Sequence, residues 1–148
     1  MRMFLLVVIM ATLVGCNEQG FNMRQAGVDA GSGMSVVIVL EAVPEANFEA
    51  TKVKIIEVST ELIGFIDTGS LAQLPLDEVK LALETFMVKK GWGDYTYLVD
   101  TLVQYVKTQS VSLTPIGTNN LQLIRIGLEQ GIVNAKRSTI DGRLKRSK

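Results

Sequence analysis

The chain has 148 residues, 47% of them hydrophobic, and its 15 basic residues balance its 15 acidic residues. This length suits one domain with an adequate core. The sequence contains no His and one Cys, which excludes His-based catalytic triads, His-bearing zinc sites and a disulfide within the chain.

Residues 1–16 have the organisation of a secretory signal. Arg2 gives a positive start, an uncharged run extends from Phe4 to Val14, and Cys16 follows. This run is well below the roughly 20 apolar residues that a membrane-spanning helix needs, so we predict an export signal. The alternatives are a signal peptide in which the cysteine has no role, or an apolar first helix of a cytosolic domain.

The segment Leu13-Val14-Gly15-Cys16 resembles the lipobox of bacterial lipoproteins. The resemblance implies cleavage between Gly15 and Cys16 and lipid attachment at Cys16, so that the protein contacts the membrane through its N-terminal lipid. The residue after the cysteine is Asn17 and not Asp, which in Gram-negative lipoproteins implies the outer membrane, on its periplasmic side. In a Gram-positive host the resemblance implies the outer face of the cell membrane. It covers residues 1–16 and carries no information about activity.

The segment after the signal, residues 16–33, is rich in Gly, Asn, Gln, Asp and Ser. Few of its residues could fill a core, so we predict a flexible tether. The apolar run 35–43 is ambiguous. Its β-branched residues favour a strand, whereas the lack of a partner strand favours a buried helix that ends at Pro44.

Two helices are predicted next. Residues 46–66 carry apolar side chains at helical spacing, with a stop at 67–70, and the apolar residues are Phe48, Ile55, Ile56, Leu62, Ile63 and Ile66. The second helix starts near Pro75, has acidic residues in its first turn and lysines in its last, and ends at Gly91. Its inner stripe is Val79, Ala82, Leu83, Phe86 and Met87.

A third helix is predicted from an N-cap at Asp94 to about Thr108, and a fourth over 119–135. The third carries the best amphipathic stripe of the chain, formed by Tyr95, Leu98, Val99, Leu102, Val103 and Val106. We therefore expect an all-α fold over 34–135: a small four-helix bundle, with a fifth short helix if 35–43 is helical. The alternative is an α+β fold with a hairpin within 36–66.

Two groups of residues are candidates for a site. Glu57 and Glu61 lie four residues apart, and such a pair could serve as acid and base in a cleft, although a solvated helix face is the favoured interpretation. The second group is a candidate ligand surface in which carboxylate and aromatic side chains lie together, as in sugar-binding sites: Trp92, Asp94, Tyr95 and Tyr97. The alternative for this group is a helix cap beside core aromatic residues.

The C-terminal segment 136–148 holds six basic residues and one acid. The basic residues are candidates for contact with an anionic surface: Lys136, Arg137, Arg143, Lys145, Arg146 and Lys148. A solvated chain end is the favoured interpretation, and the absence of aromatic residues from this segment argues against nucleic acid as a partner.

The spacing of Gly127 and Gly131 predicts close helix packing within the domain, with dimerisation as the alternative.

No motif for a cofactor or a metal is present, so we expect neither. We favour a non-enzymatic envelope lipoprotein that binds an envelope protein or a wall glycan, as an adaptor or assembly module. Proteins encoded by phages or mobile elements belong to this class. The alternative is a carboxylate-dependent enzyme that acts on peptidoglycan. The sequence does not specify an oligomeric state.

Overall fold

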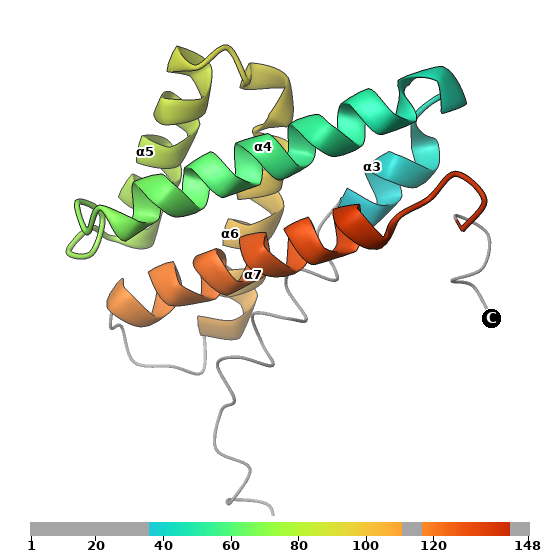
Figure 1. Ribbon diagram of the computed structural model, residues 1–148. Helices are drawn as coiled ribbons and strands as arrows, with labels where there is room; N and C mark the ends of the chain where they lie inside the picture. The colour runs from blue at the N-terminus through green and yellow to red at the C-terminus, as the bar shows by residue number, and fades with distance from the viewer. Residues whose placement is uncertain (1–35, 111–116, 143–148) are drawn as a thin grey trace, which may run out of the picture.

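The computed structural model describes residues 36–110 and 117–142, and within these ranges every regular element is a helix (Figure 1). Five α-helices are joined by two short 3-10 helices, and their bounds are α3 Val36–Ala42, η1 Glu45–Asn47, α4 Phe48–Asp67, α5 Leu76–Lys89, η2 Gly93–Tyr95, α6 Tyr97–Ser110 and α7 Gly117–Arg137. The expected all-α bundle with a short additional helix at 35–43 is confirmed. The alternative of a hairpin within 36–66 is wrong, because that stretch forms α3 and α4.

Helices α4 and α7 are the longest, and they run antiparallel side by side (Figure 1). Contacts at both ends establish the direction. Near the start of α4, Lys52 Nζ donates to the carbonyl oxygen of Ser138 at 3.0 Å, beyond the end of α7. At the end of α4, Asp67 pairs with Arg125 of the first half of α7.

Helices α5 and α6 form a second antiparallel pair, and α6 crosses behind α4 and α7 (Figure 1). Asp77 and Lys80 of α5 pair with Lys107 and Asp100 of α6, at 2.6 and 2.5 Å respectively. The short helix α3 packs against α7 and α4, and contributes the buried Val36 and Leu40. The core therefore lies between the two pairs and is closed by α3.

Two glycines end helices at positions where the chain needs a left-handed backbone. Gly69 has φ +78° after α4, and Gly91 has φ +76° after α5. At Gly91 the amide of Trp92 donates to the carbonyl of Met87 at 2.8 Å, and the amide of Gly91 donates to Val88 at 3.0 Å. This is the hydrogen bonding of a Schellman cap, and the helix ends at Gly91 as the sequence predicted.

Most residues of the predicted stripes are buried, and the others pack partly buried against the core: Ile56, Ile63, Ala82, Phe86 and Tyr95. Five residues of the α6 stripe are fully buried, namely Leu98, Val99, Leu102, Val103 and Val106. In α4 the stripe is wider than predicted, because Val58 and Ser59 are also fully buried. In α7 the buried residues include Leu123, which is 1% exposed.

Some helix ends differ from the prediction. The N-cap expected at Asp94 is wrong, because Asp94 lies in η2 and α6 begins at Tyr97. The amides of Val99 and Asp100 donate to the carbonyl of Thr96, at 3.0 Å each, so the residue that accepts the first hydrogen bonds of α6 is Thr96 and not Asp94. At the other end of the chain, α7 extends to Arg137 and Ile140 still packs against the core.

Candidate functional site

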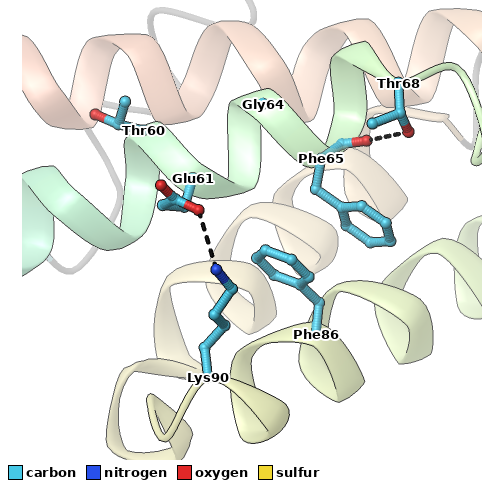
Figure 2. A pocket seen from close by; sticks show the side chains of 7 residues that line it. All are labelled: Thr60, Glu61, Gly64, Phe65, Thr68, Phe86 and Lys90. Carbon is cyan, nitrogen blue, oxygen red and sulfur yellow. Dashed lines mark hydrogen bonds and ion pairs between the residues drawn. The ribbon is translucent and has the colours of Figure 1, made fainter.

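The surface between α4 and α5 is hollowed beside a pair of stacked phenylalanines (Figure 2). The hollow measures about 470 Å³ and is open to solvent; the residues that line it are Thr60, Glu61, Gly64, Phe65, Thr68, Phe86 and Lys90. Gly64 lies at a point where an added Cβ would meet nothing within 4 Å. The missing side chain at Gly64 therefore contributes to the space.

The aromatic wall of this hollow is formed by Phe65 of α4 and Phe86 of α5. Their ring centroids lie 4.6 Å apart with an interplanar angle of 9°, so the rings are stacked. Such a pair contributes about 0.5–1.5 kcal/mol beyond the area that it buries. The stacked rings connect α4 to α5 and form the apolar wall of the hollow. Each ring is held in position by its contact with the other.

A second hollow, of about 710 Å³, lies along α5 and shares the two rings with the first. It is mostly apolar, and its lining residues are Phe65, Leu74, Glu78, Leu81, Ala82, Thr85, Phe86 and Lys89. The side chain of Leu81 is 64% exposed there. Together the hollows make the face of α4 and α5 an apolar surface with a few charged groups at its edges.

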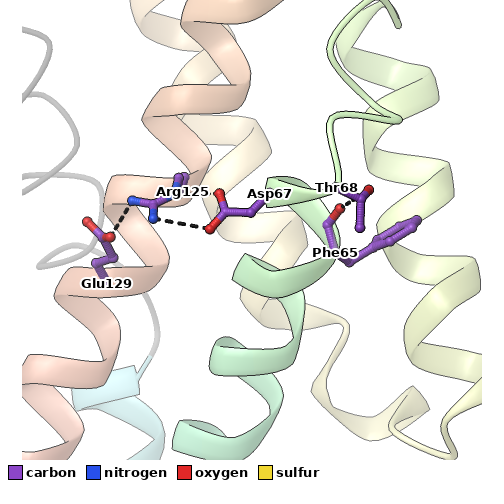
Figure 3. Close-up of polar contacts among 5 residues, drawn as sticks. All are labelled: Phe65, Asp67, Thr68, Arg125 and Glu129. Atoms are coloured by element: carbon purple, nitrogen blue, oxygen red, sulfur yellow. Dashed lines mark hydrogen bonds and ion pairs between the residues drawn. The ribbon is translucent and has the colours of Figure 1, made fainter.

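Polar contacts of Asp67 and Thr68 lie at the C-terminal end of α4, beside these hollows (Figure 3). Arg125 donates to both carboxylate oxygens of Asp67, at 2.8 and 3.2 Å, and it also pairs with Glu129. The hydroxyl of Thr68 donates to the carbonyl of Phe65 at 2.7 Å. The hydrogen bonds from Arg125 lower the pKa of Asp67 below its usual value.

The carboxylates of Glu57 and Glu61 do not share a cleft. Glu61 lines the first hollow and lies 3.4 Å from Lys90, whereas Glu57 pairs with Lys54 at 3.0 Å. Both side chains are 50% exposed. The geometry fits the solvated helix face that the sequence favoured, since acid–base catalysis on a glycoside requires two carboxyl groups facing one cleft.

The second candidate group does not present a surface of exposed rings. Trp92 is 7% exposed; its ring packs edge-on against Phe86 at 6.2 Å and is covered by Lys54 Nζ at 5.3 Å and Lys90 Nζ at 5.7 Å. Lysine ammonium groups at such distances from an indole are attracted to its face. Trp92 thus acts as a packing element between α4 and the end of α5.

Tyr95 and Tyr97 are half-buried, with ring centroids 6.1 Å apart, whereas Asp94 is exposed. The hydroxyl of Tyr97 is buried and has no hydrogen-bond partner among the described residues. Burial and the neighbouring Tyr95 raise the pKa of Tyr97 to about 12. The group therefore matches the alternative of core aromatic residues better than a sugar-binding platform.

Gly127 and Gly131 of α7 lie inside the domain. Gly127 is buried against α6, where an added Cβ would overlap the side chain of Leu102, and Gly131 is buried as well. This contact accounts for a glycine in the middle of a helix, where it costs about 1 kcal/mol relative to Ala. The motif mediates packing within the domain, as favoured from the sequence.

Several predicted site residues lie outside the described residues: Gly15, Cys16, Arg143, Lys145, Arg146 and Lys148. Lys136 and Arg137 are described, and they are exposed in the last turn of α7. Positive charge at this end of a helix complements its dipole. The interaction with the helix dipole is sufficient to explain why Lys136 and Arg137 lie there, and it requires no ligand.

Within the described residues, no group of three or more acidic or Cys side chains could hold a metal ion. None of the helices in this part of the chain has the length and apolar character needed to cross a membrane.

Sequence reasoning missed Phe65, Gly64 and Thr60 as site residues. The four-residue spacing of Thr60, Gly64 and Thr68 could have indicated the hollow, because it places small residues in a row along the outer face of α4.

Comparison with known proteins gave no match: no family model fits the sequence, and neither a curated protein nor a solved structure is significantly similar to it.

Proposed function

We propose that this protein is a lipid-anchored lipoprotein of the bacterial cell envelope, and that its helical domain binds a protein partner. The segment Leu13-Val14-Gly15-Cys16 supports the anchor. The hollow between α4 and α5 is the observation that carries the binding role, because it combines apolar walls with a few polar groups at the edge.

The chemistry of the hollow suits an apolar side chain from a partner. The rings of Phe65 and Phe86 supply contact area, and Gly64 supplies depth. Lys90 and Glu61 at the edge are joined by a surface ion pair of 3.4 Å. Such a pair is worth about 0–1 kcal/mol, so either group can exchange its partner for a charge on the bound protein at little cost.

The alternative of a peptidoglycan enzyme gains no support from the described residues, since Glu57 and Glu61 each pair with a lysine at an exposed surface. The anionic-surface role of the basic segment rests on residues of which only Lys136 and Arg137 are described. We therefore place the binding role at the hollow.

Replacement of Gly64 by Leu tests the binding role. The new side chain would occupy the hollow, and the helix should be at least as stable because Leu favours helix more than Gly. We expect cross-linking and pull-down of the full chain from host membranes to recover at least tenfold less of a specific envelope protein with Gly64→Leu than with the wild type, as loss of an apolar contact of a few kcal/mol implies.

The matched control is Gly93→Leu, because an added side chain at Gly93 also meets nothing within 4 Å but lies outside the hollow. This variant should recover the partner as the wild type does. Equal recovery by the two variants would contradict the role of the hollow.

The anchor is tested separately. Mass spectrometry of the mature protein should find Cys16 as the N-terminal residue with acyl chains attached, and Cys16→Ser should leave an unprocessed precursor. A mature chain that starts at another residue, or that carries a free thiol at position 16, would contradict the lipoprotein assignment.

A further inference from the structure

The outer face of α5 carries an apolar surface that the domain itself does not cover. Leu81 is 64% exposed and Val88 is 62% exposed, and they are the two most exposed large apolar residues of α5. Leu81 lies in the hollow of about 710 Å³, whose walls also include Leu74, Ala82 and Phe86. Exposed apolar residues beside an apolar hollow provide area that a contact with another molecule could bury.

Two charged side chains line the same hollow at opposite ends of α5. Glu78 lies in the first turn and Lys89 in the last. They are 11 residues apart, which is about three helical turns, so they project from one face at a separation of roughly 16 Å. Among the described residues neither of them forms an ion pair, whereas their neighbours Asp77 and Lys90 do.

The α5 face, with Glu78 at one end and Lys89 at the other, is complementary to a second copy of itself. If a second α5 is laid antiparallel on the first, with the twofold axis between residues 83 and 84, Glu78 of each copy faces Lys89 of the other. In the same register, Leu81 faces Phe86 and Ala82 faces Thr85. The apolar side chains of Leu81 and Phe86 then meet on both sides of the axis, the small Ala82 and Thr85 meet beside it, and opposite charges meet at both ends.

We propose that the occupant of this face is a second copy of the chain, and that two copies dimerise through antiparallel α5 helices. The Gly127–Gly131 motif, which the sequence offered as a dimer contact, is occupied within the domain, so the dimer uses a different helix. The rings of Phe65 and Phe86 line both hollows, whereas Thr60, Gly64 and Thr68 line only the partner site of α4. The inference does not depend on the lipid at Cys16.

One pair of helices of this length buries less than the roughly 1,200–2,000 Å² of a standard interface, so we expect a weak and reversible dimer. Sedimentation equilibrium of the purified full chain, in a density-matched detergent with micelles in large excess over protein, should show a monomer–dimer equilibrium. A chain that stays monomeric at the highest attainable concentration would overturn the proposal.

Charge reversal identifies the register. Glu78→Lys or Lys89→Glu alone would replace two attractive contacts per dimer by two repulsive ones, so each should weaken the association by about tenfold. The double variant Glu78→Lys/Lys89→Glu restores opposite charges across the axis and should regain the affinity of the wild type. It also places both charges unfavourably for the α5 dipole, so recovered association cannot come from a more stable helix.

The control variant is Ile38→Lys, because Ile38 is 65% exposed on α3, outside this face. It should dimerise as the wild type does. Thermal unfolding followed by circular dichroism should show every variant folded, since positions 78 and 89 are exposed. Dimers that are insensitive to single reversals, or that the double reversal does not restore, would overturn the antiparallel α5 contact.

Discussion

At the scale of single residues, the contact of Gly127 with Leu102 leaves no room for a side chain at position 127. Helices α6 and α7 approach so closely that a Cβ at position 127 would overlap the δ-methyl group of Leu102, which is itself fully buried. Two effects therefore oppose each other at this position. Alanine favours the helix by about 1 kcal/mol over glycine, whereas overpacking costs about 1–3 kcal/mol.

We expect Gly127→Ala to lower the free energy of unfolding by about 1 kcal/mol, because overpacking exceeds the gain in helix propensity. In a Leu102→Val background, which shortens the obstructing side chain, the same substitution should be neutral or stabilising. Urea unfolding of the four proteins of this double-mutant cycle measures the coupling. Equal effects of Gly127→Ala in both backgrounds would show that Leu102 is not the obstacle.

At the scale of secondary-structure elements, the end of α5 depends on the backbone of Gly91. Its φ of +76° allows the amide of Trp92 to reach the carbonyl of Met87 at 2.8 Å, and this places Trp92 against Phe86. A side chain at this φ is strained by contact of its Cβ with the backbone. The cap thus sets where the chain leaves α5 and how the aromatic cluster is assembled.

We predict that Gly91→Ala destabilises the protein by about 1–2 kcal/mol, the cost of a left-handed backbone for a residue with a Cβ. Gly93→Ala is the matched control two residues away, because Gly93 has no positive φ and open space around it; it should change the stability by less than about 0.5 kcal/mol. Thermal denaturation of both variants checks the difference. If Gly91→Ala left the stability unchanged, α5 would not depend on the left-handed backbone at position 91 to end.

At the scale of the whole molecule, ion pairs join helices that are distant in the sequence. Arg125 holds Asp67 across α4 and α7, and Lys107 holds Asp77 across α5 and α6. Each aspartate has a lowered pKa, chiefly because its basic partner donates a hydrogen bond to it. The pairs are exposed, so they orient the helices more than they stabilise them.

The lowered pKa values predict how stability depends on pH. A carboxylate with a lower pKa in the folded state stabilises the fold above its unfolded value of 3.8, and this contribution is lost as the pH falls through the folded pKa. We expect the urea midpoint of the wild type to fall below about pH 4. The double variant Asp67→Asn/Asp77→Asn should show a smaller fall.

Asp94→Asn is the control for this measurement, because Asp94 is exposed and forms no ion pair within the described ranges. Its pH profile should follow that of the wild type. If the double variant loses as much stability as the wild type between about pH 5 and pH 3, the two ion pairs are not the source of the acid sensitivity.

The candidate site was less predictable than the helices. Phe86 was recognised as an apolar residue of α5, but its stacking partner Phe65 lies 21 residues earlier, on the outer edge of α4. Trp92 stands next to Asp94 and the tyrosines in the sequence, which suggested a ligand surface, yet its ring is turned toward Phe86 and the lysines. Residues that are adjacent in the sequence need not share a surface where a 3-10 turn changes the direction of the backbone.

What the sequence by itself determined is local: the helices that follow Pro75, most of the buried stripes and the stops at 67–70 and Gly91, whereas the helical form of 35–43 came only from the structure. Periodicity and backbone freedom act within a few residues, so they can be recognised without neighbours. Only the tertiary structure decided which helices meet, that Gly127 faces Leu102, and that an uncovered apolar face on α5 ends in Glu78 and Lys89. These contacts depend on how helices from distant parts of the sequence pack together. An apolar stripe shows which face of a helix is buried, but it does not show which other helix covers that face.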